Sequence, residues 1–184
     1  MRLSAIRAGC DAAAVMDVDA GRLVLRPIRR DQARALLEGR VPAGLVFADG
    51  YPSRFSLEVM QLIAEGHRLG PYGPYFMVRN ADGAVIGELG CAVEGDSDTG
   101  EVGYSVVEPC WGQGYASEAL RSLLEHVLAM PGISRVIAHA PVGHVASRRV
   151  MEKAGMHLLG RRESIEDGEP VELVVYELAA VVSA

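Results

Sequence analysis

A glycine-rich turn near the middle of the chain leads directly into a long apolar helix. The turn is Trp111–Gly114, and it follows the alternating segment Glu101–Val107. The first turn of a helix presents free N–H groups and the positive end of the helix dipole. Glycines let those N–H groups approach an anion with no Cβ in the way, so a phosphate or pyrophosphate is the natural ligand.

The turn alone has more than one interpretation. It can be a plain turn that begins a helix. A dinucleotide-binding fingerprint is disfavoured because Ser117 stands where the third glycine belongs and Arg135, rather than an acid, follows about twenty residues on. A P-loop is excluded because no Gly-Lys-Ser/Thr sequence follows the turn.

Alternating and helical periods along the chain indicate the elements that position this turn. Residues 112–130 repeat apolar side chains at helical spacing, and the strand that follows them is expected to run parallel to the strand before them. The strands are expected at 22–28, 75–79, 85–94, 101–107, 134–140, 156–162 and 171–178, and the helices at 30–38, 55–69, 112–130 and 145–153. Ser56 is the expected cap of the second helix, and residues 41–52 read as a loop.

Length and composition place the chain in an ordinary globular class. It has 184 residues, of which 49% are hydrophobic and 23% charged, so we expect an N-terminal arm at 1–20 and a single domain at 21–184. The net charge of −6 argues against a nucleic-acid binder. No apolar run is long enough to span a membrane, and neither the three cysteines nor the five histidines form a metal-ligand cluster. We therefore expect a cytoplasmic protein with reduced thiols and no metal.

Two separated segments resemble the GNAT N-acetyltransferases. The sequence Pro109–Leu120 is similar to that family's coenzyme A pyrophosphate loop, and its Trp-Gly-x-Gly-Tyr-Ala form resembles the RimJ/RimL-like branch, which acetylates ribosomal proteins. The segment Val145–Met156 resembles the later Ser-x-Arg-Val-x-Glu-Lys-x-Gly helix of the same branch. The resemblance covers about residues 22–178, and the two motifs occur in the family's order.

This resemblance implies a fold and a cosubstrate. The fold is of the α/β (α+β) class, with a mixed central sheet of six or seven strands, mostly antiparallel, one parallel pair splayed at the cofactor cleft, and about four flanking helices. Acetyl-CoA would bind in that cleft, with pantetheine along the strand and the pyrophosphate on the amides of the turn. The residues implied for binding are Ser105, Val106, Val107, Trp111, Gly112, Gln113, Gly114, Tyr115, Ala116, Ser117, His144 and Ser147, with His144 in place of the branch's asparagine.

The implied activity is transfer of an acetyl group to an amine, which calls for a base and an acid. Glu101 is the candidate base, because it lies four residues before Ser105 on one strand and so shares its face. The alternative for Glu101 is a surface carboxylate on a hairpin shoulder. Ser147 is the candidate acid, since Met151 stands where many of these enzymes have a tyrosine, and a backbone bond or a cap is its alternative role. Tyr104 is expected on the opposite face of the strand from Glu101.

The acceptor is expected to be an amine, either a protein N-terminus or a small molecule. In the family the early helices and the late hairpin build the acceptor pocket, which corresponds to residues 40–75 and 162–172, where Tyr51, Phe55, Tyr72 and Tyr75 could form an aromatic wall. A homodimer is possible, with the apolar segment 171–182 adding a strand across the interface. The alternative function is a catalytically weak or inactive module that holds acyl-CoA as a sensor or scaffold.

Overall fold

The structure is a computed structural model that describes residues 16–66, 72–94, 97–166 and 168–180. A 3₁₀ turn at Glu108–Cys110 precedes the third helix. The remaining elements are, in chain order, β1 (Val18–Ala20), β2 (Leu23–Pro27), α1 (Arg30–Leu37), β3 (Val46–Phe47), α2 (Arg54–Glu65), β4 (Tyr75–Arg79), β5 (Ala84–Val93), β6 (Thr99–Val106), α3 (Tyr115–Leu128), β7 (Arg135–Pro141), α4 (Val145–Lys153), β8 (His157–Glu166) and β9 (Glu169–Ala179).

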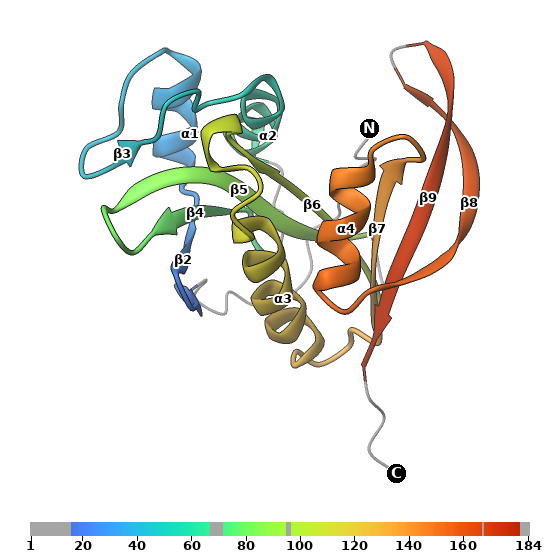
Figure 1. Cartoon of the computed structure of the whole chain (residues 1–184). Helices are drawn as coiled ribbons and strands as arrows, with labels where there is room; N and C mark the ends of the chain where they lie inside the picture. Colours follow the sequence, from blue (N-terminus) through green and yellow to red (C-terminus); the bar gives the residue numbers. More distant parts are fainter. Residues whose placement is uncertain (1–15, 67–71, 95–96, 167, 181–184) are drawn as a thin grey trace.

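All described strands belong to one sheet. The strand order is β1-β2-β4-β5-β6-β7-β9-β8, and β3 pairs with β5 beside this path (Figure 1). The pairs are antiparallel except β6 with β7 and the two-residue β3 with β5. The predicted mixed α/β class is therefore confirmed. The sheet exceeds the predicted six or seven strands because β1 lies within the expected arm 1–20 and β3 within the expected loop 41–52.

The core forms two layers, one on each face of the sheet. Alternate residues of β4 point to opposite faces. Phe76 and Val78 pack with apolar residues of α1 and α2, whereas Tyr75 and Met77 belong to the larger cluster that includes α3 and α4. Helices α1 and α2 thus cover one face, and α3 and α4 cover the other (Figure 1).

Helix α2 begins one residue earlier than expected and ends before residue 66. Ser53, not Ser56, is its cap: the Ser53 hydroxyl accepts a hydrogen bond from the Ser56 N–H at 3.1 Å. The Ser56 hydroxyl accepts the reciprocal bond from the Ser53 N–H at 3.1 Å, which makes a capping box of the two serines. The helix ends at Gly66, whose φ of +89° favours glycine.

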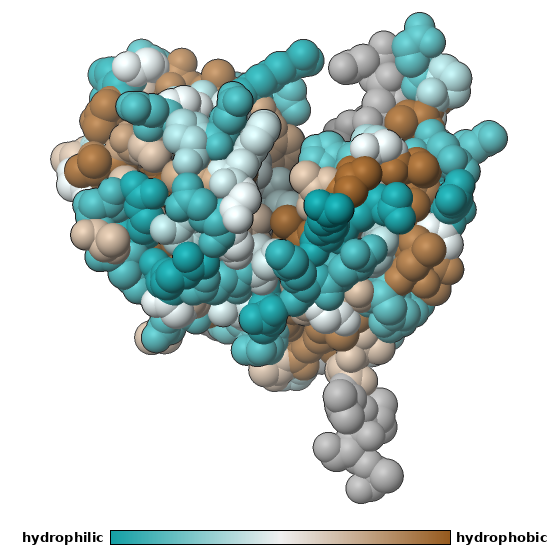
Figure 2. All heavy atoms as spheres, viewed as in Figure 1, coloured by the Kyte–Doolittle hydropathy of each residue, from teal (hydrophilic) through white to brown (hydrophobic). Residues whose placement is uncertain are grey.

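Strands β6 and β7 pair over only part of their length. The register runs from Thr99 opposite Arg135 to Val102 opposite Ala138, and the later residues of both strands are unpaired with each other. The two strands therefore diverge toward the carboxyl end of β6. Figure 2 shows the surface hollowed between the part built on β4 and β5 and the part built on β7, β8 and β9.

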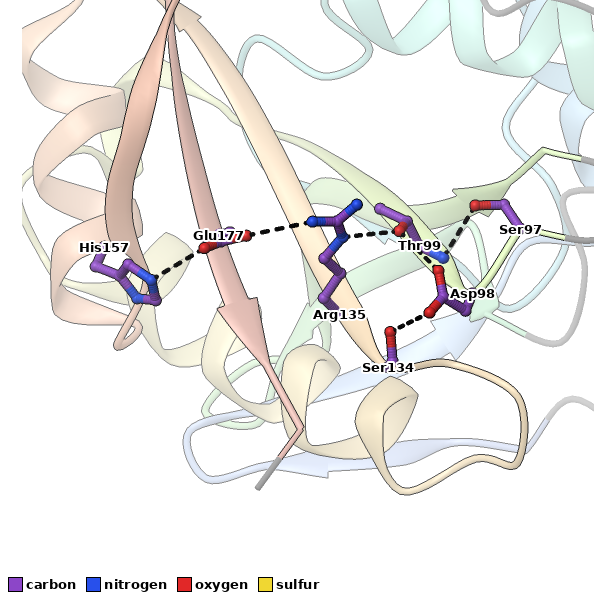
Figure 3. A network of polar contacts seen from close by, with 7 residues as sticks. All are labelled: Ser97, Asp98, Thr99, Ser134, Arg135, His157 and Glu177. Atoms are coloured by element: carbon purple, nitrogen blue, oxygen red, sulfur yellow. Dashed lines mark hydrogen bonds and ion pairs between the residues drawn. The ribbon is translucent and has the colours of Figure 1, made fainter. Parts of the chain in front are cut away.

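A polar network holds the opposite, closed end of this strand pair (Figure 3). Arg135 donates from Nε to the Thr99 hydroxyl at 2.9 Å and lies 3.9 Å from the Glu177 carboxylate, which also contacts His157. The Ser134 hydroxyl donates to the Asp98 carboxylate. Because these contacts tie β6, β7 and β9 together at one end, the strands open only at the other.

The C-terminal strand lies inside the sheet. Strand β9 pairs with β7 on one side and with β8 on the other. From Leu173 to Glu177 it has a strand on both sides, so the expectation that residues 171–182 add a strand across a dimer interface is wrong for that part of β9. Residues 181–184 lie outside the described part of the chain.

Candidate functional site

The glycine-rich turn connects the open end of β6 to the start of α3. Helix α3 begins at Tyr115, three residues later than the sequence predicts, because Gly112 and Gly114 have φ of +73° and +85°. Those values exclude both residues from a right-handed helix and favour glycine. Gly114 is the N-cap residue of α3. Because glycine has no side chain, it cannot accept a hydrogen bond from the amides of the first helical turn.

Two side chains of the turn bond back to its own backbone. The Trp111 indole N–H donates to the Val106 carbonyl at 2.6 Å, and the Gln113 amide donates to the Pro109 carbonyl at 2.9 Å. Trp111 is nevertheless 64% exposed. Trp111 and Gln113 were expected to contact the cosubstrate, but their side chains bond within the turn. The groups of the turn that remain available to a ligand are its backbone amides.

Arg22 supports the turn from the start of β2. Its guanidinium donates to the Gln113 carbonyl at 3.0 Å and to the Glu118 carboxylate at 2.8 Å, and lies 4.5 Å from the centroid of the Tyr115 ring. Glu118 is therefore ion-paired and serves the helix start. Sequence reasoning missed Arg22 because 96 residues separate it from Glu118 and no local pattern links them.

Across the cleft, α4 contributes Ser147. The Ser147 hydroxyl lies 2.8 Å from the Tyr104 hydroxyl, which also donates to the Ser147 carbonyl at 3.0 Å. Burial raises the pKa of Tyr104 to about 12. The tyrosine proton can point to the Ser147 carbonyl or to the Ser147 hydroxyl, so either hydroxyl can be the donor of the side-chain pair.

His144 is the N-cap of α4. Its Nδ1 accepts a hydrogen bond from the Ser147 N–H at 3.0 Å, and the residue is exposed. A neutral imidazole whose Nδ1 accepts carries its proton on Nε2. His144 can therefore still donate to a ligand in the cleft.

Glu101 lies on the opposite face of β6 from Tyr104, as predicted. Its carboxylate is 3.0 Å from Nδ1 of His139, a β7 residue just beyond the last paired position. The His139 side chain is 8% exposed and that of Glu101 is 35% exposed. The bond from His139 lowers the pKa of Glu101, although burial opposes that shift. Sequence reasoning missed His139, because nothing local in its strand marks it as a partner of Glu101.

A pocket adjoins Glu101 on the face that α2 covers. We call it the α2 pocket; its wall on the helix is apolar, and its lining residues are Phe55, Val59, Leu62, Pro74, Glu88, Leu89, Gly90, Cys91, Ala92, Glu101 and Gly103. Gly90 stands opposite Gly103 in the β5–β6 register, so no side chain from this pair enters the pocket. The backbone of Pro74 lies 3.0 Å from where a Cβ of residue 90 would be, which favours glycine there.

The expected aromatic wall is formed only in part. Phe55 lines the pocket, and the Tyr51 ring stacks on that of Phe47 with centroids 5.0 Å apart. Tyr75 is buried in the cluster on the other face of the sheet and takes no part.

Glu88 is the second carboxyl of the pocket, and no local pattern in the sequence marks it. It is 1% exposed, and burial raises its pKa to about 7, although nearby Ser56 and Tyr51 oppose the shift. Neither carboxylate oxygen has a hydrogen-bond partner of acceptable geometry among the described residues, nor does the Tyr51 hydroxyl.

The described residues contain neither a metal-ligand cluster nor a membrane-spanning helix. Among residues 16–66, 72–94, 97–166 and 168–180, no three His, Cys, Asp or Glu side chains form a group that could hold a metal ion. No helix in the described part of the chain is long and apolar enough to cross a membrane.

Comparisons with known proteins agree with this arrangement. A family model described as an acetyltransferase (GNAT) domain matches residues 22–157. An uncharacterized N-acetyltransferase of Bacillus subtilis, YoaA, is 29% identical over 80 residues, which are 42% of this chain and 45% of that protein. The chain spans less than half of the length of the curated relatives it matches.

Solved structures share the fold. An acetyltransferase of the GNAT family from Bacillus anthracis is 19% identical, with a TM-score of 0.68 over 90% of this chain and 99% of that one. RimL, a ribosomal alpha-N-protein acetyltransferase, was solved in complex with coenzyme A; it is 20% identical, with a TM-score of 0.67 over 91% of this chain and 100% of that one.

Proposed function

The chain belongs to the GNAT acetyltransferase family, and we propose that it transfers an acetyl group from acetyl-CoA to a primary amine by direct attack in a ternary complex. The acceptor is a protein N-terminus or a small-molecule amine. The observation that carries this proposal is the divergence of β6 from β7 directly beside the start of α3, where no side chain caps the helix. RimL, which has the same fold, binds coenzyme A, and this supports the same cosubstrate here.

Acetyl-CoA would lie in the cleft with its pyrophosphate on the backbone amides from Gly112 to Ser117. Nothing lies within 4 Å of the position of a Cβ at Gly112, so the turn is open on that side. Free amides at a helix start favour a doubly charged anion. The pantetheine arm would follow Ser105, Val106 and Val107, with His144 donating from Nε2.

On the α2 face, the acceptor amine attacks the acetyl carbon and the carbon–sulfur bond breaks. The proton lost by the amine passes to Glu101, directly or through a water molecule. The bond from His139 favours the ionised carboxylate, which is the form that accepts a proton. His139 therefore orients the base and keeps it charged.

On the opposite face, the Ser147 hydroxyl supplies the proton that the departing CoA thiolate takes up. When Tyr104 donates to that hydroxyl, the serine proton is free to face the cleft, and Tyr104 can replace it once it is lost, since the two oxygens are 2.8 Å apart. The base and the acid then approach the reacting carbon from opposite faces of the sheet.

A second candidate function is an acyl-CoA-binding module with little or no turnover. The observation that favours it is the Trp111 indole bond to the Val106 carbonyl, since that carbonyl belongs to a residue expected beside the pantetheine arm. A cosubstrate that needs this carbonyl must displace the indole.

Three further expectations from the sequence stay predictions: a homodimer, a cytoplasmic location and the division into an arm at 1–20 and a domain at 21–184. Within the described residues, β1 and β8 are the ends of the main strand path and are therefore the edges open to a second copy. Val18–Ala20 pairs with β2 and so joins the sheet.

Release of CoA thiol from acetyl-CoA in the presence of a panel of amines and N-terminal peptides tests the enzyme against the binding module. The enzyme predicts amine-dependent thiol release that Glu101→Gln reduces by about a hundredfold or more. Tight binding of CoA with no turnover across the panel supports the module instead.

A further inference from the structure

Two carboxylates, Glu101 and Glu88, occupy the two ends of the α2 pocket. In the β5–β6 register Ala92 stands opposite Glu101, Gly90 opposite Gly103 and Glu88 opposite Ser105. We call each of these cross-strand pairs a row. Residues two apart on a strand share a face, so the three rows form one surface under the pocket. At about 3.3 Å per residue, the row of Glu88 lies about 7 Å from the glycine row and about 13 Å from the row of Glu101.

Glu88 is buried beside neutral hydroxyl groups, those of Ser56 and Tyr51, which lower its pKa without offsetting the effect of burial. It is 1% exposed, and none of its side-chain acceptors is satisfied by a described residue. Ser56, the nearest hydroxyl on α2, shares a hydrogen bond of 2.8 Å with Ser53 in the helix cap. Phe76, directly opposite on β4, adds only an apolar contact surface. An unpaired buried carboxyl is expensive, and a cationic ligand would remove much of that cost.

The rest of the pocket has the opposite character. Phe55, Val59 and Leu62 present apolar side chains from α2, and the glycine row leaves room beneath them. Along the pocket, a carboxylate, an apolar wall and a second carboxylate follow one another. A ligand with an amine at each end and methylenes between them fits this order.

We infer that the α2 pocket binds the acceptor, and that the acceptor is a small linear amine with a second positively charged nitrogen, which Glu88 holds. This inference rests on the proposed function. The nitrogen to be acetylated lies at the glycine row near Glu101, the methylenes lie along α2, and the distal ammonium reaches Glu88. The Tyr51 hydroxyl is a further polar group at that end, and it has no hydrogen-bond partner among the described residues. Glu88 is thus a residue that determines specificity, and it takes no proton from the reacting nitrogen.

The test compares two probes of equal chain length, the diamine putrescine and the monoamine butylamine, by isothermal titration calorimetry on the full chain with CoA present. The wild-type chain is expected to bind putrescine at least about tenfold more tightly than butylamine. Glu88→Gln is expected to remove that preference, whereas Glu125→Gln, an exposed carboxylate on α3 at the other face of the sheet, leaves it intact. Equal affinity for both probes in the wild type, or an unchanged preference in Glu88→Gln, overturns the inference.

Thiol release from acetyl-CoA, measured on the same variants and amines without added CoA, keeps this inference separate from the proposed function. Diamine binding that depends on Glu88 without thiol release leaves the pocket assignment standing and contradicts the acetyltransferase. Thiol release with N-terminal peptides and no preference for the diamine supports the acetyltransferase and contradicts the pocket assignment. A melting curve for each variant shows that it is folded, and Tyr51→Phe, which keeps the ring stack, tests the same end of the pocket with Glu88 in place.

Discussion

Protonation of Glu88 couples folding to pH below neutrality. Its pKa is raised from 4.5 to about 7 by burial, so the folded chain holds a proton that the unfolded chain has released between those pH values. Its contribution to stability is therefore complete below about pH 4.5 and is lost as the pH rises through about 7. The shift corresponds to about 3 kcal/mol at most.

Glu88→Gln is predicted to be more stable than the wild type at pH 8, with a difference that shrinks toward pH 5. The amide keeps the shape of the side chain but carries no charge to bury. Urea unfolding at several pH values measures the difference, and Glu125→Gln is the exposed control. A difference that grows as the pH falls contradicts this account of the buried carboxyl.

The pairing of His139 with Glu101 predicts a shifted pH profile. His139→Leu removes the hydrogen bond that lowers the pKa of Glu101, so that pKa rises. The acidic limb of kcat/KM for acetyl transfer then moves to higher pH, because the Glu101 carboxylate forms only at a higher pH. His157→Leu is the matched control, since His157 also contacts a glutamate, at 3.2 Å, but at the closed end of β6 and β7. An acidic limb that does not move in His139→Leu shows that His139 does not set the ionisation of Glu101.

Among the elements, the turn before α3 depends on backbone geometry. Gly112→Ala places a Cβ where nothing lies within 4 Å, so its effect comes from the φ of +73° alone. We predict a loss of about 1 kcal/mol in unfolding free energy and weaker CoA binding, because the amides turn away from the pyrophosphate. Gly143→Ala is the control, since it has equal room and no positive φ. Chemical denaturation and CoA titration measure both effects, and equal behaviour of the two variants contradicts the role of the turn.

The sequence predicted elements better than it predicted contacts between them. The period of α3 and the glycines before it are local, so the helix and the turn were placed to within three residues. The S-x-x-S spacing at Ser53 contains the cap of α2, yet either serine satisfies the pattern, and only the backbone angles of residue 53 decide. The partners of Glu101 and Glu118 lie 38 and 96 residues away. Such partners depend on strand order and register, which no local period specifies.

The register also explains why Glu88 was not predicted from the sequence as a pocket residue. Strand β5 has an irregularity opposite Met77 and Val78, and the face that each later residue takes depends on it. A single-residue shift would exchange Glu88 for Leu89 on the α2 face. Its position in the pocket therefore follows from the assembled sheet.

At the scale of the whole molecule, the cleft divides the sheet into two parts that are joined at the closed end of β6 and β7. A ligand that contacts both parts stabilises the folded chain. We predict that CoA at about a hundred times its Kd adds about 2.7 kcal/mol of stability, whereas NAD at the same concentration adds little. Thermal unfolding with each ligand measures this, and an equal effect of NAD returns the glycine-rich turn to the dinucleotide interpretation.

The most direct measurement of the central claim is a crystal structure of the chain grown with acetyl-CoA. We expect the pyrophosphate within hydrogen-bond distance of the amides from Gly112 to Ser117 and the pantetheine arm between the divergent ends of β6 and β7. We also expect the thioester carbon between Glu101 on one face and Ser147 on the other. Acetyl-CoA bound elsewhere, or a turn whose amides are covered by the protein's own side chains in those crystals, would contradict it.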